Sequence, residues 1–265
     1  MNDESVALVE CADSADMIDA GDYPIPVREA PEISHMRDEE SELAIPTYLE
    51  EQYWWAYLRP GSIRVFEREW LVNLILWGNM RSLSDAVLQE INGKKNGQVL
   101  QVACVYGDFS QRLARQLNST ETNFHLVDIA PIQLDNARRK LQEYSDCHIC
   151  RQDSSALNFE SGKFDETVVF FLLHEQPEKV RRETMAEAVR VTRPGGKVIF
   201  VDYHGPHWLN PMRYLMYPVL KWLEPFALDL WRNPLRHYLP KHIGDDQVSH
   251  QSYFGGLYQK VVVNC

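Results

Sequence analysis

The chain has 265 residues and a net charge of −11, and its acidity is concentrated at one end. Residues 1–42 carry 13 Asp and Glu against two Arg, so this segment accounts for the whole net charge and the remainder is neutral. A neutral body lacks the basic surface that non-specific nucleic-acid binding requires, so we expect no nucleic-acid partner. The sequence has no run of about 18 apolar residues, and we therefore expect no membrane-spanning helix.

The N-terminal segment has few aromatic residues, many charges and scattered prolines. This composition predicts a disordered acidic tail over residues 1–42. The segment lacks the basic and then apolar order of a secretory signal, and five cysteines in a chain of this length indicate reduced thiols, so we expect a cytoplasmic protein. We divide the remainder into an N-terminal helical cap at 43–97 and an α/β domain at 98–265 with an insert at 204–244.

Apolar residues at helical spacing dominate residues 46–92 and predict that the cap is made of helices. Its first, aromatic segment is interrupted by the Pro-Gly pair at 60–61, because these residues break helices. A second helix is expected over residues 62–77, and a polar turn over residues 93–97 ends the cap.

From residue 98 onward, strands and helices alternate, which predicts a parallel sheet with crossover helices. The expected strands and the helices between them cover residues 98–104, 110–117, 123–127, 131–144, 148–151, 166–172, 177–190 and 197–202, in chain order. An RPGG turn at 193–196 precedes the fifth strand. Segment 254–264, with its run of three valines, is expected to belong to an antiparallel edge pair. The fold class is therefore α/β, with a mostly parallel sheet and an antiparallel edge strand.

The first expected strand leads into a loop with an altered glycine pattern. Its sequence, VLQVACVYGDFSQRLA, is similar to the VLDLGCGTG motif of class I S-adenosylmethionine (SAM) methyltransferases. Gly107 is kept, but Val105 and Tyr106 stand where the motif has Gly and Thr. Glycine is used there because a Cβ would collide with a ligand that lies against the backbone. We therefore predict a SAM-binding fold in which the ligand sits differently.

Acidic residues after the next strands fit the same pattern. Asp128 follows the second strand, where an acid accepts hydrogen bonds from the two ribose hydroxyls, although it could instead cap the next helix. Asp153 stands where an acid contacts the adenine amino group, with a solvated turn acid as the alternative. The expected cofactor-binding residues are Gln101, Ala103, Val105, Tyr106, Gly107, Asp128, Ile129, Asp153 and Ser154.

A second group of polar residues follows the fourth and fifth strands. His174 comes directly after the fourth strand, and Asp202 and His204 end the fifth. Because ligands bind beyond the carboxyl ends of parallel strands, we expect these side chains to converge near Tyr106 and Asp128. Imidazole and carboxylate groups at such a point indicate a metal site or a base, although a lone histidine is more often structural.

The insert at 204–244 is rich in Trp, Tyr, Pro and Leu, and basic residues such as Arg213 and Lys221 interrupt its apolar runs. It is either a lid packed on the sheet or a surface that takes up a lipid tail and touches the membrane interface. An exposed amphipathic surface and a packed lid share one sequence pattern, so both interpretations stay open.

The segments YWWAYLRPGSIRVFEREW, VACVYGDFS and LLHEQPEKVRRE, together with the Trp-rich insert, resemble the rhodoquinone biosynthesis family. That divergent family is related to the ubiquinone and menaquinone C-methyltransferases, and the resemblance spans residues 46–265. It implies a Rossmann-like SAM-binding domain at 98–265 and an enzyme that converts ubiquinone to rhodoquinone by replacing a ring methoxy group with an amino group. SAM would be the amino donor, Mn²⁺ would be required, and the protein would associate peripherally with the inner membrane and serve anaerobic respiration.

A side chain as large as Tyr106 would displace the methionine part of SAM while Asp128 still holds its ribose. The α-amino nitrogen would then face the quinone in place of the methyl group. An α-amino group has a pKa of about 8, so a nearby base such as His174 would free its lone pair. His174 and Tyr106 are accordingly the expected catalytic residues.

Manganese prefers oxygen and imidazole ligands. Asp202 and His204 are the expected metal ligands, with Glu175 and Asp108 as alternates. Bound to a quinone carbonyl, the ion would act as a Lewis acid and make the methoxy-bearing carbon electrophilic, so that the amine adds and methanol leaves.

Two other functions remain open. The chain could be an ordinary methyltransferase that acts on a quinone or a quinone precursor. It could also be a catalytically inactive protein of the same fold that binds a quinone or scaffolds a membrane complex. The altered loop favours the inactive protein, whereas the polar residues at the strand ends disfavour it.

Overall fold

The computed structural model describes residues 43–53 and 60–265. The predicted acidic tail, 1–42, lies outside these ranges, as do residues 54–59 of the aromatic segment, so the disorder of the tail stays a prediction. None of the helices within the described ranges combines the length and the apolar composition that a bilayer crossing needs.

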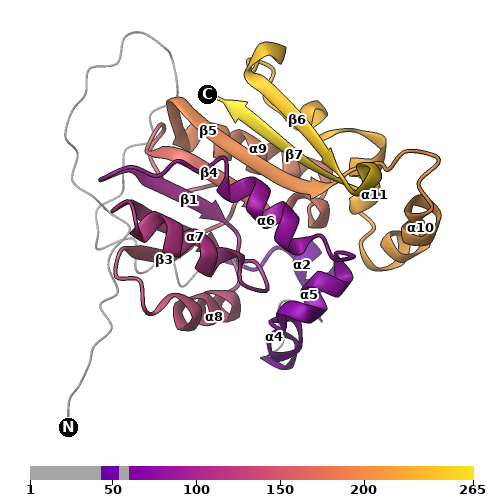
Figure 1. Ribbon diagram of the computed structural model, residues 1–265, viewed down its shortest axis with the longest axis horizontal. Helices are drawn as coiled ribbons and strands as arrows, with labels where there is room; N and C mark the ends of the chain where they lie inside the picture. Colours follow the sequence, from indigo (N-terminus) through magenta and orange to yellow (C-terminus); the bar gives the residue numbers. More distant parts are fainter. Residues whose placement is uncertain (1–42, 54–59) are drawn as a thin grey trace.

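Seven strands of the described chain form one sheet in the order β3-β2-β1-β4-β5-β7-β6 (Figure 1). Strands β1 to β5 run parallel, whereas β7 pairs antiparallel with both β5 and β6. The bounds are Gln98–Val102 (β1), Asn123–Asp128 (β2), Cys147–Arg151 (β3), Phe164–Phe170 (β4), Thr192–Tyr203 (β5), Val248–Tyr253 (β6) and Tyr258–Asn264 (β7). The predicted α/β fold with a mostly parallel sheet and an antiparallel edge is confirmed.

The helices complete the alternation of the central domain and form the cap and the insert. Their bounds are Thr47–Gln52 (α2), Pro60–Phe66 (α4), Glu69–Ile75 (α5), Met80–Leu88 (α6), Phe109–Asn118 (α7), Pro131–Leu141 (α8), Glu178–Val191 (α9), Met212–Leu223 (α10) and Ala227–Arg232 (α11). A short 3-10 turn, η1 (Leu173–Glu175), follows β4 directly.

Two local predictions are wrong. The single helix expected over 62–77 is split into α4 and α5, because Arg68 adopts an extended conformation with ψ 111°. The neighbouring Glu67 pairs with Lys140 of α8 at 2.9 Å, and this contact lies outside the local sequence pattern. The turn expected at 193–196 instead belongs to β5, whose register against β4 shifts between Phe164 and Glu166.

The sheet is buried on both faces, which explains the nearly continuous apolar runs in its parallel strands. Along β1, Val99 packs with residues of α6, α7 and α8, and the next residue, Leu100, packs with residues of α9 on the opposite face. This alternation follows from the two-residue period of a strand. The ends of the parallel strands are thereby held rigidly, and the polar residues that follow them have fixed positions.

The insert folds back over the carboxyl end of the sheet, where α11 contacts η1. Arg181 of α9 is fully buried and donates hydrogen bonds to the carbonyl oxygens of Leu173 at 2.8 Å and Phe226 at 3.0 Å. A buried cation that is shared between η1 and the insert fixes their relative position. The insert is thus a packed lid on its inner side, where Leu230 and Tyr238 are buried, while much of α10 is exposed.

Candidate functional site

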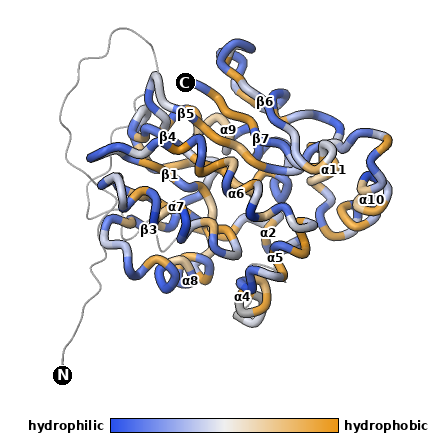
Figure 2. The backbone as a smooth tube through the Cα atoms, in the orientation of Figure 1, coloured by the Kyte–Doolittle hydropathy of each residue, from blue (hydrophilic) through white to orange (hydrophobic). Residues whose placement is uncertain are grey.

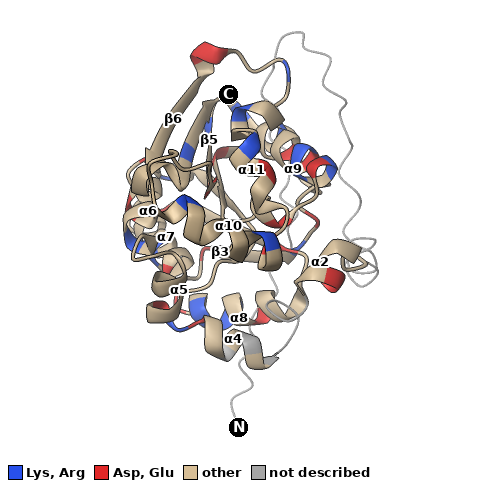
Figure 3. Ribbon diagram, turned by 90° about the vertical axis from the view of Figure 1, so that its right-hand side faces the viewer, with Lys and Arg blue, Asp and Glu red and all other residues tan. Residues whose placement is uncertain are grey.

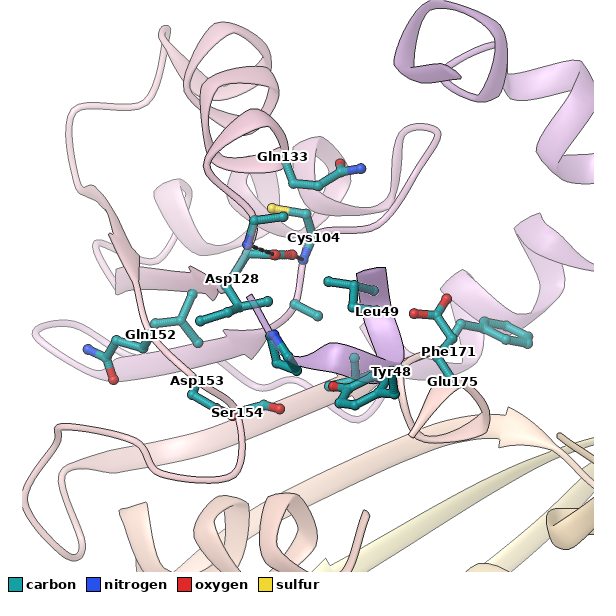
Figure 4. Close-up of a pocket in the computed structure, with 16 residues that line it drawn as sticks. Tyr48, Leu49, Cys104, Asp128, Gln133, Gln152, Asp153, Ser154, Phe171 and Glu175 are labelled. Carbon is teal, nitrogen blue, oxygen red and sulfur yellow. Dashed lines mark hydrogen bonds between the residues drawn. The ribbon is translucent and has the colours of Figure 1, made fainter. Parts of the chain in front are cut away.

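A cavity opens beyond the carboxyl ends of β1, β2 and β4 (Figure 4). Its volume is about 640 Å³ with the open mouth included. Its walls come from the loop after β1, the ends of β2 and β3, η1 and the cap helix α2. The lining residues are Pro46, Tyr48, Leu49, Ala103, Cys104, Val127, Asp128, Ile129, Ala130, Gln133, Gln152, Asp153, Ser154, Phe171, Leu172 and Glu175.

Asp128 is fixed at the centre of this wall by two backbone donors. The Cys104 N–H donates to one carboxylate oxygen at 2.7 Å and the Ala130 N–H donates to the other at 2.8 Å (Figure 4). Burial raises the pKa of Asp128, and these backbone hydrogen bonds oppose that rise. The Cys104 thiol and the Ile129 N–H are further donors to this carboxylate, so the side chain is held firmly at the start of α8.

Asp153 and Ser154 line the far end of the cavity, after β3. One oxygen of Asp153 accepts hydrogen bonds from the Ser155 N–H at 2.8 Å and from the Ser155 hydroxyl at 2.7 Å. The Ser154 hydroxyl accepts from Gln176 at 2.9 Å and lies 3.0 Å from the hydroxyl of Thr184. Both side chains are therefore held in place, and the second oxygen of Asp153 can face a ligand.

The altered loop after β1 does not shape the cavity in the way the sequence predicts. Tyr106 is not a lining residue: its ring stacks on Phe66 with centroids 5.6 Å apart, and its hydroxyl accepts a hydrogen bond from Gln133 at 2.7 Å. The expected displacement of a ligand by the bulk of Tyr106 is therefore wrong for this conformation. Ala103 lines the cavity instead, and its φ of 72° is in the left-handed region that favours glycine.

Gln101, Val105 and Gly107 also lie outside the lining of the cavity. Gln101 is fully buried and donates to the Ala103 carbonyl oxygen and to the Ser110 hydroxyl, both at 2.9 Å. The carbonyl oxygen of Gly107 accepts a hydrogen bond from Lys140 at 2.5 Å. These predicted cofactor-binding residues hold the backbone of the loop, whereas Ala103, Asp128, Ile129, Asp153 and Ser154 reach the cavity.

The cap contributes residues that the sequence did not single out. Pro46, Tyr48 and Leu49 cover the cavity from α2, and Figure 4 shows Leu49 and Tyr48 between Asp128 and Glu175. Burial, together with the negative charges of Glu175 and Asp153, raises the pKa of Tyr48 well above its usual value, so its hydroxyl stays protonated. The aromatic composition of this segment could have indicated a ligand-binding role, but the helical spacing of its residues predicts only packing.

His174 and Asp202 meet as predicted, at the carboxyl ends of β4 and β5. The His174 ring nitrogen Nδ1 lies 2.9 Å from Asp202 Oδ1. Asp202 is fully buried, and it also accepts hydrogen bonds from the backbone N–H groups of Leu173, His174 and Tyr203 at 2.7–3.2 Å. On the other side, His174 Nε2 lies 3.7 Å from Glu175 Oε1.

The charge of this cluster is opposite to what a free base requires. Burial alone would lower the pKa of His174, but the carboxylates of Asp202, Glu224 and Glu175 outweigh burial and raise it to about 9. His174 is therefore an imidazolium at neutral pH, and the prediction that it acts as a free base is corrected. The ring is also enclosed edge-on by Phe171 and Tyr203, with centroids 6.0 Å and 5.0 Å away.

Glu224 and Tyr53 complete the buried cluster and were missed by the sequence analysis. Glu224 caps the end of α10, and burial raises its pKa while the charge of His174 lowers it. Tyr53, which follows α2, is fully buried, and burial together with the negative charge of Glu224 raises the pKa of its hydroxyl well above its usual value. The cluster thus joins the cap, the insert and the strand ends, which are far apart in the sequence.

Asp202 and His204 do not form the predicted metal site. Both oxygens of Asp202 are engaged by backbone N–H groups and by His174. His204 has its Nδ1 2.9 Å from the Gly256 carbonyl oxygen, and its ring lies beside that of His250, at 5.4 Å. Within residues 43–53 and 60–265, no three His, Cys, Asp or Glu side chains are grouped as metal ligands. The donor set present here does not fit manganese.

Comparison with known proteins relates this architecture to methyltransferases. Residues 99–196 match the family described as "Methyltransferase domain". A demethylmenaquinone methyltransferase from Staphylococcus saprophyticus is 26% identical over 136 residues, which are 51% of this chain and 57% of that protein. A 2-phytyl-1,4-naphtoquinone methyltransferase from Trichormus variabilis is 27% identical over 133 residues, 49% of this chain and 57% of the relative.

Solved structures extend the likeness beyond the matched segment. Phosphoethanolamine N-methyltransferase 2 from Haemonchus contortus, solved with S-adenosylhomocysteine, superposes with a TM-score of 0.56 at 15% identity, covering 80% of this chain and 47% of that one. The chain has the class I methyltransferase fold. Over about half of its length it is similar in sequence to the two quinone methyltransferases named above, and its cavity lies at the carboxyl ends of the parallel strands, where open α/β sheets bind ligands. The chain spans somewhat over half the length of the two curated relatives named above.

Proposed function

We propose that the chain is a SAM-dependent enzyme that converts ubiquinone to rhodoquinone, replacing a ring methoxy group with an amino group taken from SAM. The observation that supports SAM use is the cavity itself, which Asp128 and Asp153 line at the ends of consecutive strands. An adenosine group laid along that wall places its ribose on Asp128 and its base beside Asp153. The names of the relatives, which act on other quinones, support a quinone as the acceptor.

The loop after β1 supports amino transfer rather than methyl transfer. Ala103 aligns with the first glycine of the VLDLGCGTG motif, and its side chain occupies the cavity wall. A methionine chain cannot approach that backbone as closely as it could approach a glycine. We infer that the methionine chain of SAM turns towards Tyr48 and Glu175, so that its α-amino nitrogen is the atom that faces the quinone. In this proposal Ala103, and not Tyr106, changes the position of the methionine chain.

Glu175 replaces His174 as the proposed proton acceptor. Its carboxylate lines the cavity and lies beside the cap residue Leu49 (Figure 4), and its side chain is nearly buried. The α-amino group of SAM has a pKa of about 8 and is mostly protonated at neutral pH, so it must lose a proton before its lone pair can attack the ring, and a carboxylate beside it can take that proton. The ring of His174 lies 3.7 Å from the Glu175 carboxylate.

The nitrogen then adds to the ring carbon that carries the methoxy group, and the methoxy group leaves with the electron pair of the broken C–O bond and takes up the proton that the nitrogen releases, as methanol. This substitution involves no net oxidation or reduction of the ring. Its product is a secondary amine still bonded to the α carbon of SAM, so formation of rhodoquinone requires a second step that breaks this N–C bond, and we assign no residue to that step. The manganese requirement rests on the family resemblance alone, and Asp202 and His204 do not fit the ion.

The test uses SAM labelled in two separate preparations, with heavy nitrogen in the α-amino group or with heavy carbon in the methyl group. The full chain is incubated with ubiquinone and each SAM preparation, with and without Mn²⁺. The masses of the quinone products are then measured by mass spectrometry. Heavy nitrogen in the product supports amino transfer. Heavy carbon in the product, or no labelled product under any condition, contradicts it.

A second candidate function is C-methylation of a quinone or quinone precursor, which the names of the relatives favour directly. It predicts the heavy-carbon result, with a quinone that lacks a ring methyl group as the acceptor. The third possibility, a non-catalytic quinone-binding scaffold, predicts quinone binding without transfer of either label.

A further inference from the structure

Large apolar side chains that face solvent are concentrated on two segments of the described chain. Apart from Phe254, they all lie within residues 65–77 or 208–223. Trp222 is 87% exposed, and Trp208 and Trp70 are more than half exposed. Single exposed apolar residues are ordinary, but a contiguous group of this size marks an interaction surface.

The two segments form one surface. The indole N–H of Trp77, just after α5, donates to the sulfur of Met216 in α10 at 3.1 Å, so the helices are in contact. Figures 1 and 3 show α5 and α10 on the same side of the molecule, and Figure 2 shows the apolar residues along both. We call this surface the apolar face; its most exposed members are Trp70, Leu74, Trp208, Leu209, Tyr214 and Trp222.

The insert side of the apolar face is positively charged, whereas the side formed by residues 60–77 is neutral, with two Arg and two Glu. Residues 204–223 contain Arg213 and Lys221 but no Asp or Glu, although the whole chain carries a net charge of −11. Lys221 is exposed, and no ion pair to it occurs among the described residues. Both cations belong to α10.

This combination fits a lipid surface better than a protein surface. Trp and Tyr favour the boundary between water and lipid, Leu enters the acyl region, and Lys and Arg reach anionic headgroups. A second copy of the chain would instead bring an identical face with the same positive charges, which repel one another. The positive charge therefore favours an anionic bilayer as the partner of this surface.

The position of the apolar face relates it to the reacting end of the cavity. Helix α10 ends at Glu224, whose buried carboxylate interacts with His174 at the strand ends. Its inner residues Met216 and Leu220 are buried against the core, so the outer residues are held in place. A bilayer that touches α5 and α10 would lie next to the elements that frame the site.

We propose that the apolar face docks on an anionic lipid bilayer, with α5 and α10 lying in the interface. The enzyme would then take a quinone whose long tail stays in the lipid. This identification of the substrate's location rests on the proposed function, whereas the docking itself depends only on the surface.

Co-sedimentation of the full chain with vesicles tests the docking, without SAM or quinone. The vesicles contain phosphatidylcholine alone or phosphatidylcholine with phosphatidylglycerol, and we expect binding to the second kind that weakens with salt. The double variant Trp70→Ala, Trp222→Ala should bind at least about tenfold more weakly, since each indole buries a large apolar area. Lys221→Ala should bind about fivefold more weakly. Lys179→Ala, an exposed cation on α9, is the matched control and should bind like the wild type.

Unaltered binding of the double variant, or no binding of the wild type to anionic vesicles, would overturn the proposal. Equilibrium sedimentation tests whether a second copy of the chain covers the apolar face instead. A wild-type dimer that the two tryptophan substitutions dissociate would show that it does. Activity assays separate this proposal from the proposed function. The double variant should keep its rate with a short-tailed, water-soluble ubiquinone and lose it with long-tailed ubiquinone in vesicles. Vesicle binding without any amination would leave the docking standing and remove the proposed reaction.

Discussion

Replacing Asp202 with asparagine removes the charge that holds His174 as a cation and keeps the shape of the side chain. The neighbouring carboxylates, Asp202 foremost, raise the pKa of His174 from 6.5 to about 9 against the opposing effect of burial. One pKa unit corresponds to about 1.36 kcal/mol, so protonation of His174 stabilises the folded state by about 3 kcal/mol. This stability is fully present below pH 6.5, the unfolded value, and is lost as the pH rises through about 9.

In Asp202→Asn the imidazole should be neutral at neutral pH, because burial then dominates its pKa. We expect the free energy of unfolding to fall by about 3 kcal/mol below pH 6.5, and the decline between pH 6.5 and 9 to disappear. Urea unfolding followed by circular dichroism across this pH range measures both effects. Asp135→Asn, an exposed residue of α8 in a surface ion pair, is the control and should change stability by less than about 1 kcal/mol. An Asp202→Asn protein that keeps the wild-type stability and pH profile would refute the buried ion pair.

Three further changes probe the cavity. Asp128→Ala should weaken SAM binding at least about 100-fold in titration calorimetry, because two hydrogen bonds to a charged acceptor are lost, and unchanged affinity would remove the ribose assignment. Glu175→Gln should keep the SAM affinity and lower the amination rate about 100-fold or more. The control Glu178→Gln, at the exposed start of α9, should keep both the affinity and the rate. A normal amination rate in Glu175→Gln would exclude Glu175 as the proton acceptor. Ala103→Gly should raise the free energy of unfolding by about 1 kcal/mol in urea melts, since its φ of 72° suits glycine, and a loss of stability would contradict the strain.

The fold was predictable because its signals are local. Alternating apolar strands and amphipathic helices determine the order of the central elements, and the acid after β2 follows from a motif confined to a strand, a turn and a helix start. Strand β6 escaped prediction because its side chains, VSHQSY, are mostly exposed and lack apolar alternation. The break at Arg68 accompanies a contact between Glu67 and Lys140, which the helical spacing of the cap does not contain.

The site was predictable only where one element carries the whole signal. Asp128 and Asp153 reach the cavity as expected, because each follows its own strand. The state of His174 depends on Glu224, fifty residues further along the chain, and no spacing rule links the two. The prediction for Tyr106 failed for a related reason: a large side chain in a loop can turn away from the cavity when the cap supplies a partner such as Phe66.

The proposed reaction requires that SAM present its amino nitrogen, not its methyl group, to the quinone. A structure of the protein with SAM and a short-tailed ubiquinone would show which group faces the ring. We expect the ribose hydroxyls on Asp128 and the α-amino nitrogen, beside Glu175, as the SAM atom closest to the methoxy-bearing ring carbon. A complex in which the sulfur-bound methyl group is closest to the ring, with the amino nitrogen held against the loop after β1, would contradict it.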